Sequence, residues 1–212
     1  MDVIKVLIVE QDAGWQHTIS DYLRKRSNIA VVSVVASREQ ALQLISFVDI
    51  DVAIIDVRLT PGNGTDGICT AAEMMNIKPV KVIMFTSCME RQTIIEAFKI
   101  GIVNCVDKSD LCELPEAIYD AYYDRSSIHR SVSCILREEF SRLSREEEKA
   151  ILTKMELEIL RYLHQGIKQS DIERCLNISR STVKYHVHNI LSKLKVPSSK
   201  QAVLLTRAKK WF

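Results

Sequence analysis

The chain has 212 residues, of which 47% are hydrophobic and 26% are charged, and its formal net charge is +2. These values are typical of a globular protein with one large domain or two small ones. The sequence contains no apolar stretch near the roughly 20 residues that span a bilayer, and no basic and apolar leader opens it, so we expect a cytoplasmic protein without a membrane partner.

The charge is distributed unevenly along the chain. Residues 149–212 contain 13 Lys and Arg residues and 4 Asp and Glu residues. The preceding 148 residues contain 16 Lys and Arg residues and 23 Asp and Glu residues. An acidic part joined to a basic part predicts two domains with different partners, of which the basic one is the candidate for contact with a polyanion. The six cysteines have no paired metal spacing, and we expect them to be reduced and buried.

The first part of the chain alternates strand patterns with helical patterns. Runs rich in Val and Ile predict strands buried on both faces at residues 4–9, 30–35, 52–55, 80–85 and 103–106. Helical segments follow at residues 15–26, 38–47, 68–75, 90–99 and 114–123. This alternation predicts an α/β domain over residues 1–123, with a doubly wound, five-stranded parallel sheet of the flavodoxin-like (βα)5 type.

Polar residues follow four of these strands. Asp56, Thr86 and Lys108 each end an apolar run, and the acidic stretch 10–12 ends another. Because the carboxyl ends of parallel strands meet at one edge of a sheet, we expect these side chains to lie together. Such a set can hold a divalent cation, present Asp56 as a nucleophile and neutralise a phosphoryl group.

Residues 124–148 are rich in Ser, Arg and Glu and keep a partial helical spacing, which predicts a partly helical linker. Residues 149–212 read as four short helices, at residues 155–165, 169–176, 180–193 and 199–210. The first and the fourth are opened by capping boxes, Thr153 with Glu156 and Ser198 with Gln201. We therefore expect a small all-α domain here.

The third of these helices has one apolar face and one polar, basic face. The apolar face contains Val183, Val187 and Ile190. A short basic helix that follows a helix and a turn is suited to a major groove. Lys184 is a candidate for contact with guanine or phosphate, and Tyr185 for contact with a thymine methyl or phosphate. The predicted DNA-contacting residues are Ser181, Thr182, Lys184, Tyr185 and His188.

The first part resembles the receiver domain of two-component systems. Glu10, Asp56, Thr86 and Lys108 match in order, each at the end of the expected strand. The resemblance implies that Asp56 is the phospho-acceptor, assisted by Thr86 and Lys108, and that a sensor histidine kinase is the donor. It implies Mg²⁺ as cofactor, with Glu10 and Asp56 as metal ligands and Gln11 and Asp12 as further candidates.

Three departures from the receiver pattern stand out. The family's second acidic residue is replaced by Gln11, which predicts weaker Mg²⁺ binding unless Asp12 or a water compensates. The position of the family's switch aromatic is taken by Cys105. The loop of residues 57–67 is about three residues longer than the usual pattern.

The last part resembles the LuxR-type helix-turn-helix domain of NarL/FixJ response regulators. The matching sequence motifs span residues 150–208 and include Thr182-Val183-Lys184, Asn189-Ile190 and Lys193-Leu194. The resemblance implies a regulator that binds double-stranded promoter DNA as a homodimer paired through its fourth helix.

Two alternatives remain open. Gln11 and Cys105 favour an atypical or orphan regulator of the same architecture, controlled by partner binding or constitutive dimerisation. A remote alternative is an aspartyl-phosphate hydrolase, although the sequence has no substrate domain for it. We expect a regulator rather than an enzyme.

Overall fold

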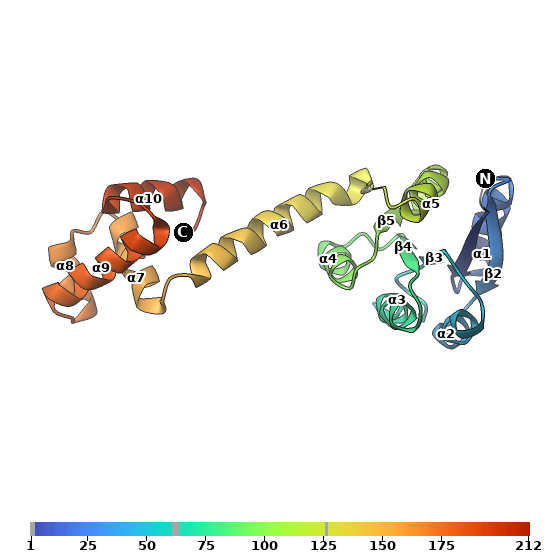
Figure 1. The fold of residues 1–212 in the computed structure, drawn as a ribbon, viewed down its shortest axis with the longest axis horizontal. Helices are drawn as coiled ribbons and strands as arrows, with labels where there is room; N and C mark the ends of the chain where they lie inside the picture. Colours follow the sequence, from blue (N-terminus) through green and yellow to red (C-terminus); the bar gives the residue numbers. More distant parts are fainter. Residues whose placement is uncertain (1–2, 61–63, 126) are drawn as a thin grey trace. The chain divides into compact units, whose positions relative to one another are not determined.

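The structure is a computed structural model that describes residues 3–60, 64–125 and 127–212 (Figure 1). The chain divides into two compact units, residues 1–137 and 138–212. Among the described residues, none of the helices combines the length and the apolar character needed to cross a bilayer.

The first unit is built on a parallel sheet. Its strands are β1 (Ile4–Val9), β2 (Ile29–Val35), β3 (Val52–Ile55), β4 (Lys81–Thr86) and β5 (Asn104–Asp107). They lie in the order β2-β1-β3-β4-β5, and every pairing is parallel. The doubly wound five-stranded sheet is thus confirmed. β4 and β5 begin and end one residue later than predicted, so Thr86 is the last residue of β4 rather than the first after it.

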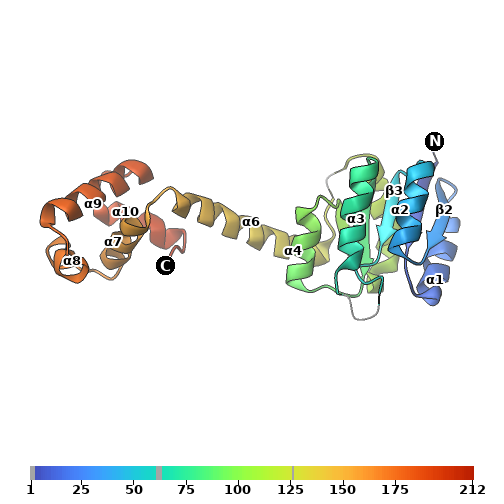
Figure 2. The same ribbon diagram turned by 90° about the horizontal axis from the view of Figure 1, so that it is seen from below.

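Helices cover both faces of this sheet. Figure 2 shows α2 (Arg38–Phe47), α3 (Asp66–Ile77) and α4 (Arg91–Lys99) side by side in front of it. Helices α1 (Ala13–Arg24) and α5 (Leu114–Tyr122) pack against the other face. Successive strand residues alternate between two buried clusters, so that Leu7 and Val9 face α2, α3 and α4, whereas Val6 and Ile8 face α1 and α5. Burial on both faces explains why the strands read as continuous apolar runs.

A long helix, α6 (Arg130–Ala150), occupies most of the predicted linker. Its first turn is fixed to the first unit. Val132 is fully buried in the core cluster, and the backbone N–H of His129 donates to Asn104 Oδ1 over 3.0 Å. Arg130 Nη2 also lies 3.1 Å from Glu113 Oε1. Glu113 ends η1 (Lys108–Glu113), the short 3₁₀ turn between β5 and α5.

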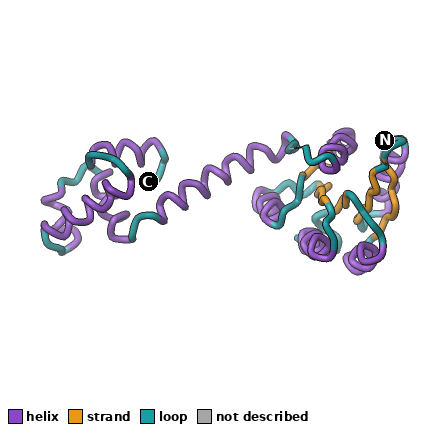
Figure 3. Tube along the Cα trace, viewed as in Figure 1, coloured by secondary structure: helices purple, strands orange, loops and turns teal. Residues whose placement is uncertain are grey.

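The described part of the second unit contains only helices and loops (Figure 3). After the end of α6 come α7 (Lys154–His164), α8 (Gln169–Leu176), α9 (Arg180–Leu194) and α10 (Ser199–Ala208). The Thr153–Glu156 capping box is formed, and Ser179 and Ser198 cap α9 and α10 through their side chains. The expected small helical domain is therefore present.

One structural detail adds to the sequence-based predictions, and another corrects them. The C-terminal tail is docked, because Trp211 is 4% exposed within the helical core and its carbonyl accepts a hydrogen bond from Lys149 Nζ. The expectation of buried cysteines is wrong for four of the six cysteines. They lie on the outward-facing sides of helical turns, at Cys69, Cys112, Cys134 and Cys175.

Candidate functional site

Three charged side chains meet at the carboxyl edge of the sheet. Lys108 Nζ donates to Glu10 Oε2 over 2.6 Å and to Asp56 Oδ2 over 2.7 Å. Glu10 follows β1, Asp56 follows β3 and Lys108 follows β5, so the long lysine side chain spans the width of β4 to reach them. All three are nearly buried, with side-chain exposures of 2%, 11% and 7%. The fold thus brings together residues that are 46 to 98 positions apart.

This triplet has more negative charge than positive. Burial raises the pKa of the Glu10 carboxyl and the nearby Asp56 raises it further, although hydrogen bonds from Lys108 and from the Asp12 backbone N–H oppose the shift. Two buried carboxylates that share one ammonium form a site for additional positive charge. Lys108 bonds Asp56 Oδ2, and the other oxygen, Oδ1, has a longer contact of 3.4 Å with the backbone N–H of Arg58 at the carboxyl edge of the sheet.

Thr86 and Trp15 complete the surroundings of the triplet. Thr86 is 1% exposed at the end of β4, and its Oγ1 accepts the backbone N–H of Cys88 over 3.1 Å. The ring of Trp15, in the first turn of α1, lies 5.1 Å from Lys108 Nζ and makes an edge contact with Phe85. Sequence reasoning did not identify Trp15 as part of the site, because a tryptophan in an amphipathic helix is typical of a core residue.

The candidate metal ligands differ in what they can contribute. Gln11 is exposed, and Asp12 is the N-cap of α1, where its Oδ1 accepts the Trp15 N–H over 2.9 Å. The described part of the chain holds no group of three or more His, Cys, Asp or Glu side chains arranged for a metal ion. The oxygens of Glu10 and Asp56 nevertheless converge on one cation, Lys108. That pair fits a hard divalent ion that keeps several of its waters.

Cys105 lies in the core rather than in the site. It is 2% exposed, and its Sγ is 3.9 Å from Met89 Sδ. Burial raises the pKa of the Cys105 thiol to about 12, so the side chain behaves as a small neutral group. It therefore provides no ring that could turn between a buried and an exposed position.

The loop that follows Asp56 is partly outside the described residues, which do not include residues 61–63. Its far end returns to the segment that directly follows Asp56. Asp66 Oδ1 accepts the Leu59 N–H over 2.9 Å, and the Gly67 N–H donates to the Val57 carbonyl. A Cβ at Gly67 would lie 1.9 Å from the carbonyl oxygen of Asp56. Glycine is therefore required where α3 begins against the site.

The expected DNA-contacting residues lie on α9. Val183, Val187 and Ile190 are buried in the helical core. Four of the five expected residues are exposed and follow helical spacing, so they share one face: Ser181, Lys184, Tyr185 and His188. Thr182 is half-buried, and its Oγ1 lies 2.8 Å from Ser179 Oγ at the cap of the helix.

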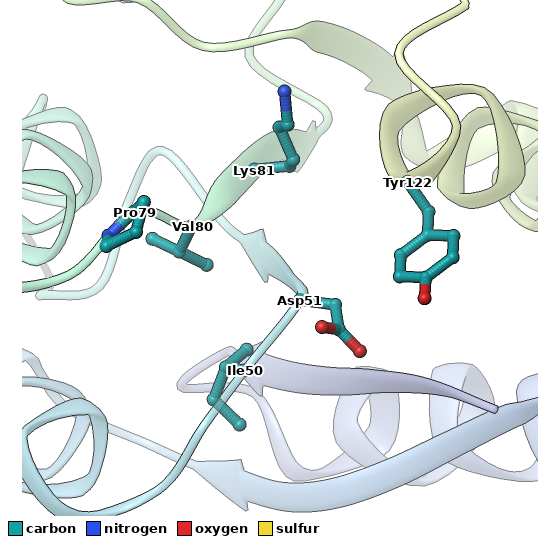
Figure 4. Close-up of a pocket in the computed structure, with 6 residues that line it drawn as sticks. All are labelled: Ile50, Asp51, Pro79, Val80, Lys81 and Tyr122. Carbon is teal, nitrogen blue, oxygen red and sulfur yellow. The ribbon is translucent and has the colours of Figure 1, made fainter. Parts of the chain in front are cut away.

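A separate pocket of about 360 Å³ lies at the opposite edge of the sheet, where β3 and β4 begin. Figure 4 shows its lining, with the Lys81 ammonium pointing away from Asp51. Lys81 instead pairs with Asp124. Because ligand chemistry in parallel sheets occurs at the carboxyl ends of the strands, this pocket is separate from the site formed by Glu10, Asp56 and Lys108.

A sheet of this order, with the aspartate–lysine–glutamate triplet at its carboxyl edge and a second helical unit, defines the class of two-domain response regulators. Residues 6–119 match the profile of the family described as response regulator receiver domain, and residues 150–206 match that of bacterial regulatory proteins, luxR family. The chain belongs to the response regulator receiver family, and its second domain belongs to the luxR family of DNA-binding regulators.

Individual relatives agree with this assignment along the whole chain. The chain is 30% identical over 202 residues to the response regulator protein VraR of Staphylococcus saprophyticus and to that of Staphylococcus epidermidis, covering 95% of each sequence. Among solved structures, it resembles a Salmonella typhimurium RcsB response regulator, with a TM-score of 0.60, 20% identity and coverage of 98% and 100% of the two chains. The response regulator ChrA of a heme-sensing two-component system gives a TM-score of 0.51 at 24% identity, with full coverage of both chains.

Proposed function

We propose that this DNA-binding response regulator is switched by phosphorylation of Asp56, with a sensor histidine kinase as the donor. The single observation that carries the proposal is the buried triplet of Asp56, Lys108 and Glu10 at the carboxyl edge of the sheet. In this account residues 1–123 act as the receiver, residues 124–148 as the linker and residues 149–212 as the DNA-binding domain. We propose the cytoplasm as the compartment, because there the protein can reach both its kinase and its promoter.

The acceptor chemistry follows from the triplet. An Asp56 carboxylate oxygen attacks the phosphorus, forming an acyl phosphate as the P–N bond to the donor histidine breaks and that ring takes up a proton. Lys108 already contacts the same carboxylate, so a small rotation brings its ammonium to a phosphoryl oxygen. Thr86, at the end of the adjacent strand, can donate its hydroxyl proton to another phosphoryl oxygen.

Mg²⁺ would be held by Glu10 and Asp56, with waters filling the remaining positions. When bound, it supplies positive charge that screens the anionic oxygens of the transferring group. Gln11 brings no charge, and the Asp12 carboxylate is already bonded to the first turn of α1. These two observations support weak metal binding. We propose no turnover of a small substrate, so the protein is a regulator and not an enzyme.

The second domain is proposed to read double-stranded promoter DNA through α9. Ser181, Lys184, Tyr185 and His188 form its exposed polar face, with Thr182 at the capped end. The solved structure of an RcsB–DNA complex, whose protein is 20% identical to this chain, supports DNA binding by analogy. α10 is proposed as the homodimer contact, because Leu204 is 55% exposed beside a groove lined by Leu163, Val203 and Arg207.

A second candidate function is an atypical regulator of the same architecture that works without phosphorylation. Specific observations favour it: Gln11 replaces a metal-binding carboxylate, and Cys105 is buried where the family has its switch aromatic. Partner binding or constitutive dimerisation would then control DNA binding.

The intact mass of the full-length protein after incubation with acetyl phosphate distinguishes the two candidates. Wild-type protein with Mg²⁺ is expected to gain the mass of one phosphoryl group, and Asp56→Asn is expected to gain none. The same incubation with a chelator in place of Mg²⁺ tests the metal requirement. Equal uptake by wild type and Asp56→Asn would refute Asp56 as the acceptor, and no uptake by either would favour the atypical regulator.

A further inference from the structure

The environment of the Lys108 ammonium is completed by an aromatic ring. Its nitrogen bonds two carboxylate oxygens, at 2.6 and 2.7 Å, and the Trp15 ring centroid lies 5.1 Å away. The lysine side chain is 7% exposed. An ammonium has three protons, so the two carboxylate contacts leave one proton over, and the Trp15 ring lies within the range of a cation–π contact with the same nitrogen.

Trp15 is itself held in place from two sides. Its backbone N–H donates to Asp12 Oδ1, which fixes the first turn of α1 beside the end of β1. Its ring meets the Phe85 ring edge-on, with centroids 5.9 Å apart and an angle of 80° between planes. Phe85 is 1% exposed in β4 and directly precedes Thr86. The indole is therefore a fixed surface against which the lysine rests.

We propose that Trp15 is a positioning residue for Lys108, holding its ammonium between Glu10 and Asp56. The inference rests on the proposed phosphorylation of Asp56. The face of an indole attracts a cation, and it does so more strongly when the cation is removed from water. The contact consequently stabilises the arrangement in which the ammonium occupies the two carboxylates, and it limits the distance that Lys108 moves when a phosphoryl group arrives.

This role has two consequences of opposite sign. Lys108 competes with a divalent cation for the same two carboxylates, so loosening it should strengthen Mg²⁺ binding. A loosened Lys108 is also less well placed to meet the phosphoryl oxygens, so phosphorylation should become slower even when Mg²⁺ is saturating. Loss of packing alone would weaken Mg²⁺ binding and phosphorylation together. Stronger Mg²⁺ binding combined with slower phosphorylation therefore identifies Trp15 as a positioning residue.

The experiment compares three variants of the full-length protein. Trp15→Leu removes the ring, and Trp15→Phe retains a weaker aromatic face. Tyr22→Leu is the matched control, because Tyr22 is a half-buried aromatic on the same helix and packs against the same cluster. The cation over its ring is Arg26 rather than Lys108. Mg²⁺ affinity is measured by calorimetry, and the phosphorylation rate by intact mass with acetyl phosphate at saturating Mg²⁺.

For Trp15→Leu we expect Mg²⁺ affinity to rise about threefold or more and the phosphorylation rate to fall about tenfold. Trp15→Phe should lie between Trp15→Leu and wild type, which keeps the test decisive if the leucine variant folds poorly. Tyr22→Leu should stay within about twofold of wild type in both measurements.

The inference is overturned if Trp15→Leu and Tyr22→Leu behave alike, or if Mg²⁺ binding and phosphorylation weaken together in Trp15→Leu. In that case wild-type phosphorylation still supports the proposed function. If wild type takes up no phosphoryl group, the proposed function fails, and calorimetry alone decides whether Trp15 holds Lys108 against Mg²⁺. Wild-type protein that takes up neither a phosphoryl group nor Mg²⁺ would overturn both the proposed function and the inference about Trp15.

Discussion

Replacing Lys108 by Met removes the only cation of the triplet that it forms with Glu10 and Asp56, and it keeps most of the side chain's volume. Glu10 and Asp56 would then face each other, nearly buried and without their shared ammonium. Removing one partner of a buried ion pair costs about 3–5 kcal/mol. We expect the lower end of that range, about 3 kcal/mol at neutral pH, because the Glu10 carboxyl can take up a proton.

The pH dependence has a definite sign. The folded-state pKa of Glu10 is raised from its ordinary value of 4.5 by burial, and loss of Lys108 would raise it further. Ionisation of Glu10 therefore destabilises the folded state. This destabilisation is absent below about pH 4.5 and grows as the pH rises through the folded-state pKa of Glu10. The deficit of Lys108→Met relative to wild type should shrink as the pH is lowered from 7 towards 4.5. Mg²⁺ should stabilise the variant more than the wild type.

The assay is urea unfolding of full-length protein in a Trp211→Phe background. Trp15 is then the only tryptophan and reports the first unit alone, which matters because a two-domain protein need not unfold in one step. Lys81→Met is the matched control, since Lys81 forms an exposed pair with Asp124 and should lose less than about 1 kcal/mol. Equal losses in Lys108→Met and Lys81→Met, or a Lys108→Met deficit that does not change with pH, would refute the reasoning.

Other variants test the metal site, the DNA-contacting helix, the dimer contact and the ion pair of Glu156. Gln11→Asp should tighten Mg²⁺ binding in calorimetry, and unchanged affinity would mean that the ion does not approach residue 11. Lys184→Ala should cost about 1–3 kcal/mol of DNA affinity if Lys184 reads a base, or reduce the salt slope by about one if it holds a phosphate; wild-type binding contradicts both. Leu204→Glu should reduce cooperative binding to a palindromic duplex without lowering the melting temperature, whereas intact cooperativity would place the dimer contact elsewhere. Burial alone would raise the pKa of Glu156, but hydrogen bonds from Lys193 and from the Thr153 N–H lower that pKa overall. Ionised Glu156 therefore stabilises the folded state above about pH 4.5, and this stabilisation is lost in acid. Glu156→Gln should therefore lower unfolding free energy by about 1–3 kcal/mol at neutral pH and by less in acid, and a loss independent of pH would argue against the ion pair.

The sheet and the meeting of Glu10, Asp56 and Lys108 at its carboxyl edge could be predicted because they depend on simple patterns. Continuous Val and Ile runs mark strands buried on both faces, and parallel strands bring their carboxyl ends to one edge. Asp56 and Lys108 therefore had to lie near each other once the strands were assigned. The length of α6 was harder to predict, because its sequence is polar. Its ion pairs, such as Arg142 with Glu139 and Glu146 at spacings of three and four, stabilise the helix locally.

Other features depend on contacts that no local pattern reveals. The Trp15 ring meets an ammonium 93 positions later in the chain, and a tryptophan in a helix gives no indication of that partner. Asp12 could have served as a metal ligand or as a helix cap, and only the first turn of α1 shows that it is the cap. The exposed cysteines were mispredicted because a small apolar residue fits either side of a helix.

Whether phosphorylation of Asp56 controls DNA binding is tested most directly by measuring DNA affinity and phosphorylation together. A duplex selected from random sequence by the full-length protein is titrated with wild type and with Asp56→Asn, each before and after treatment with acetyl phosphate and Mg²⁺ at matched salt. If phosphorylation of Asp56 is the switch, treatment raises the DNA affinity of the wild type in proportion to the phosphorylated fraction measured by mass, and it leaves the affinity of Asp56→Asn unchanged. An equal rise in both proteins, or no rise in fully phosphorylated wild type, would contradict this switch.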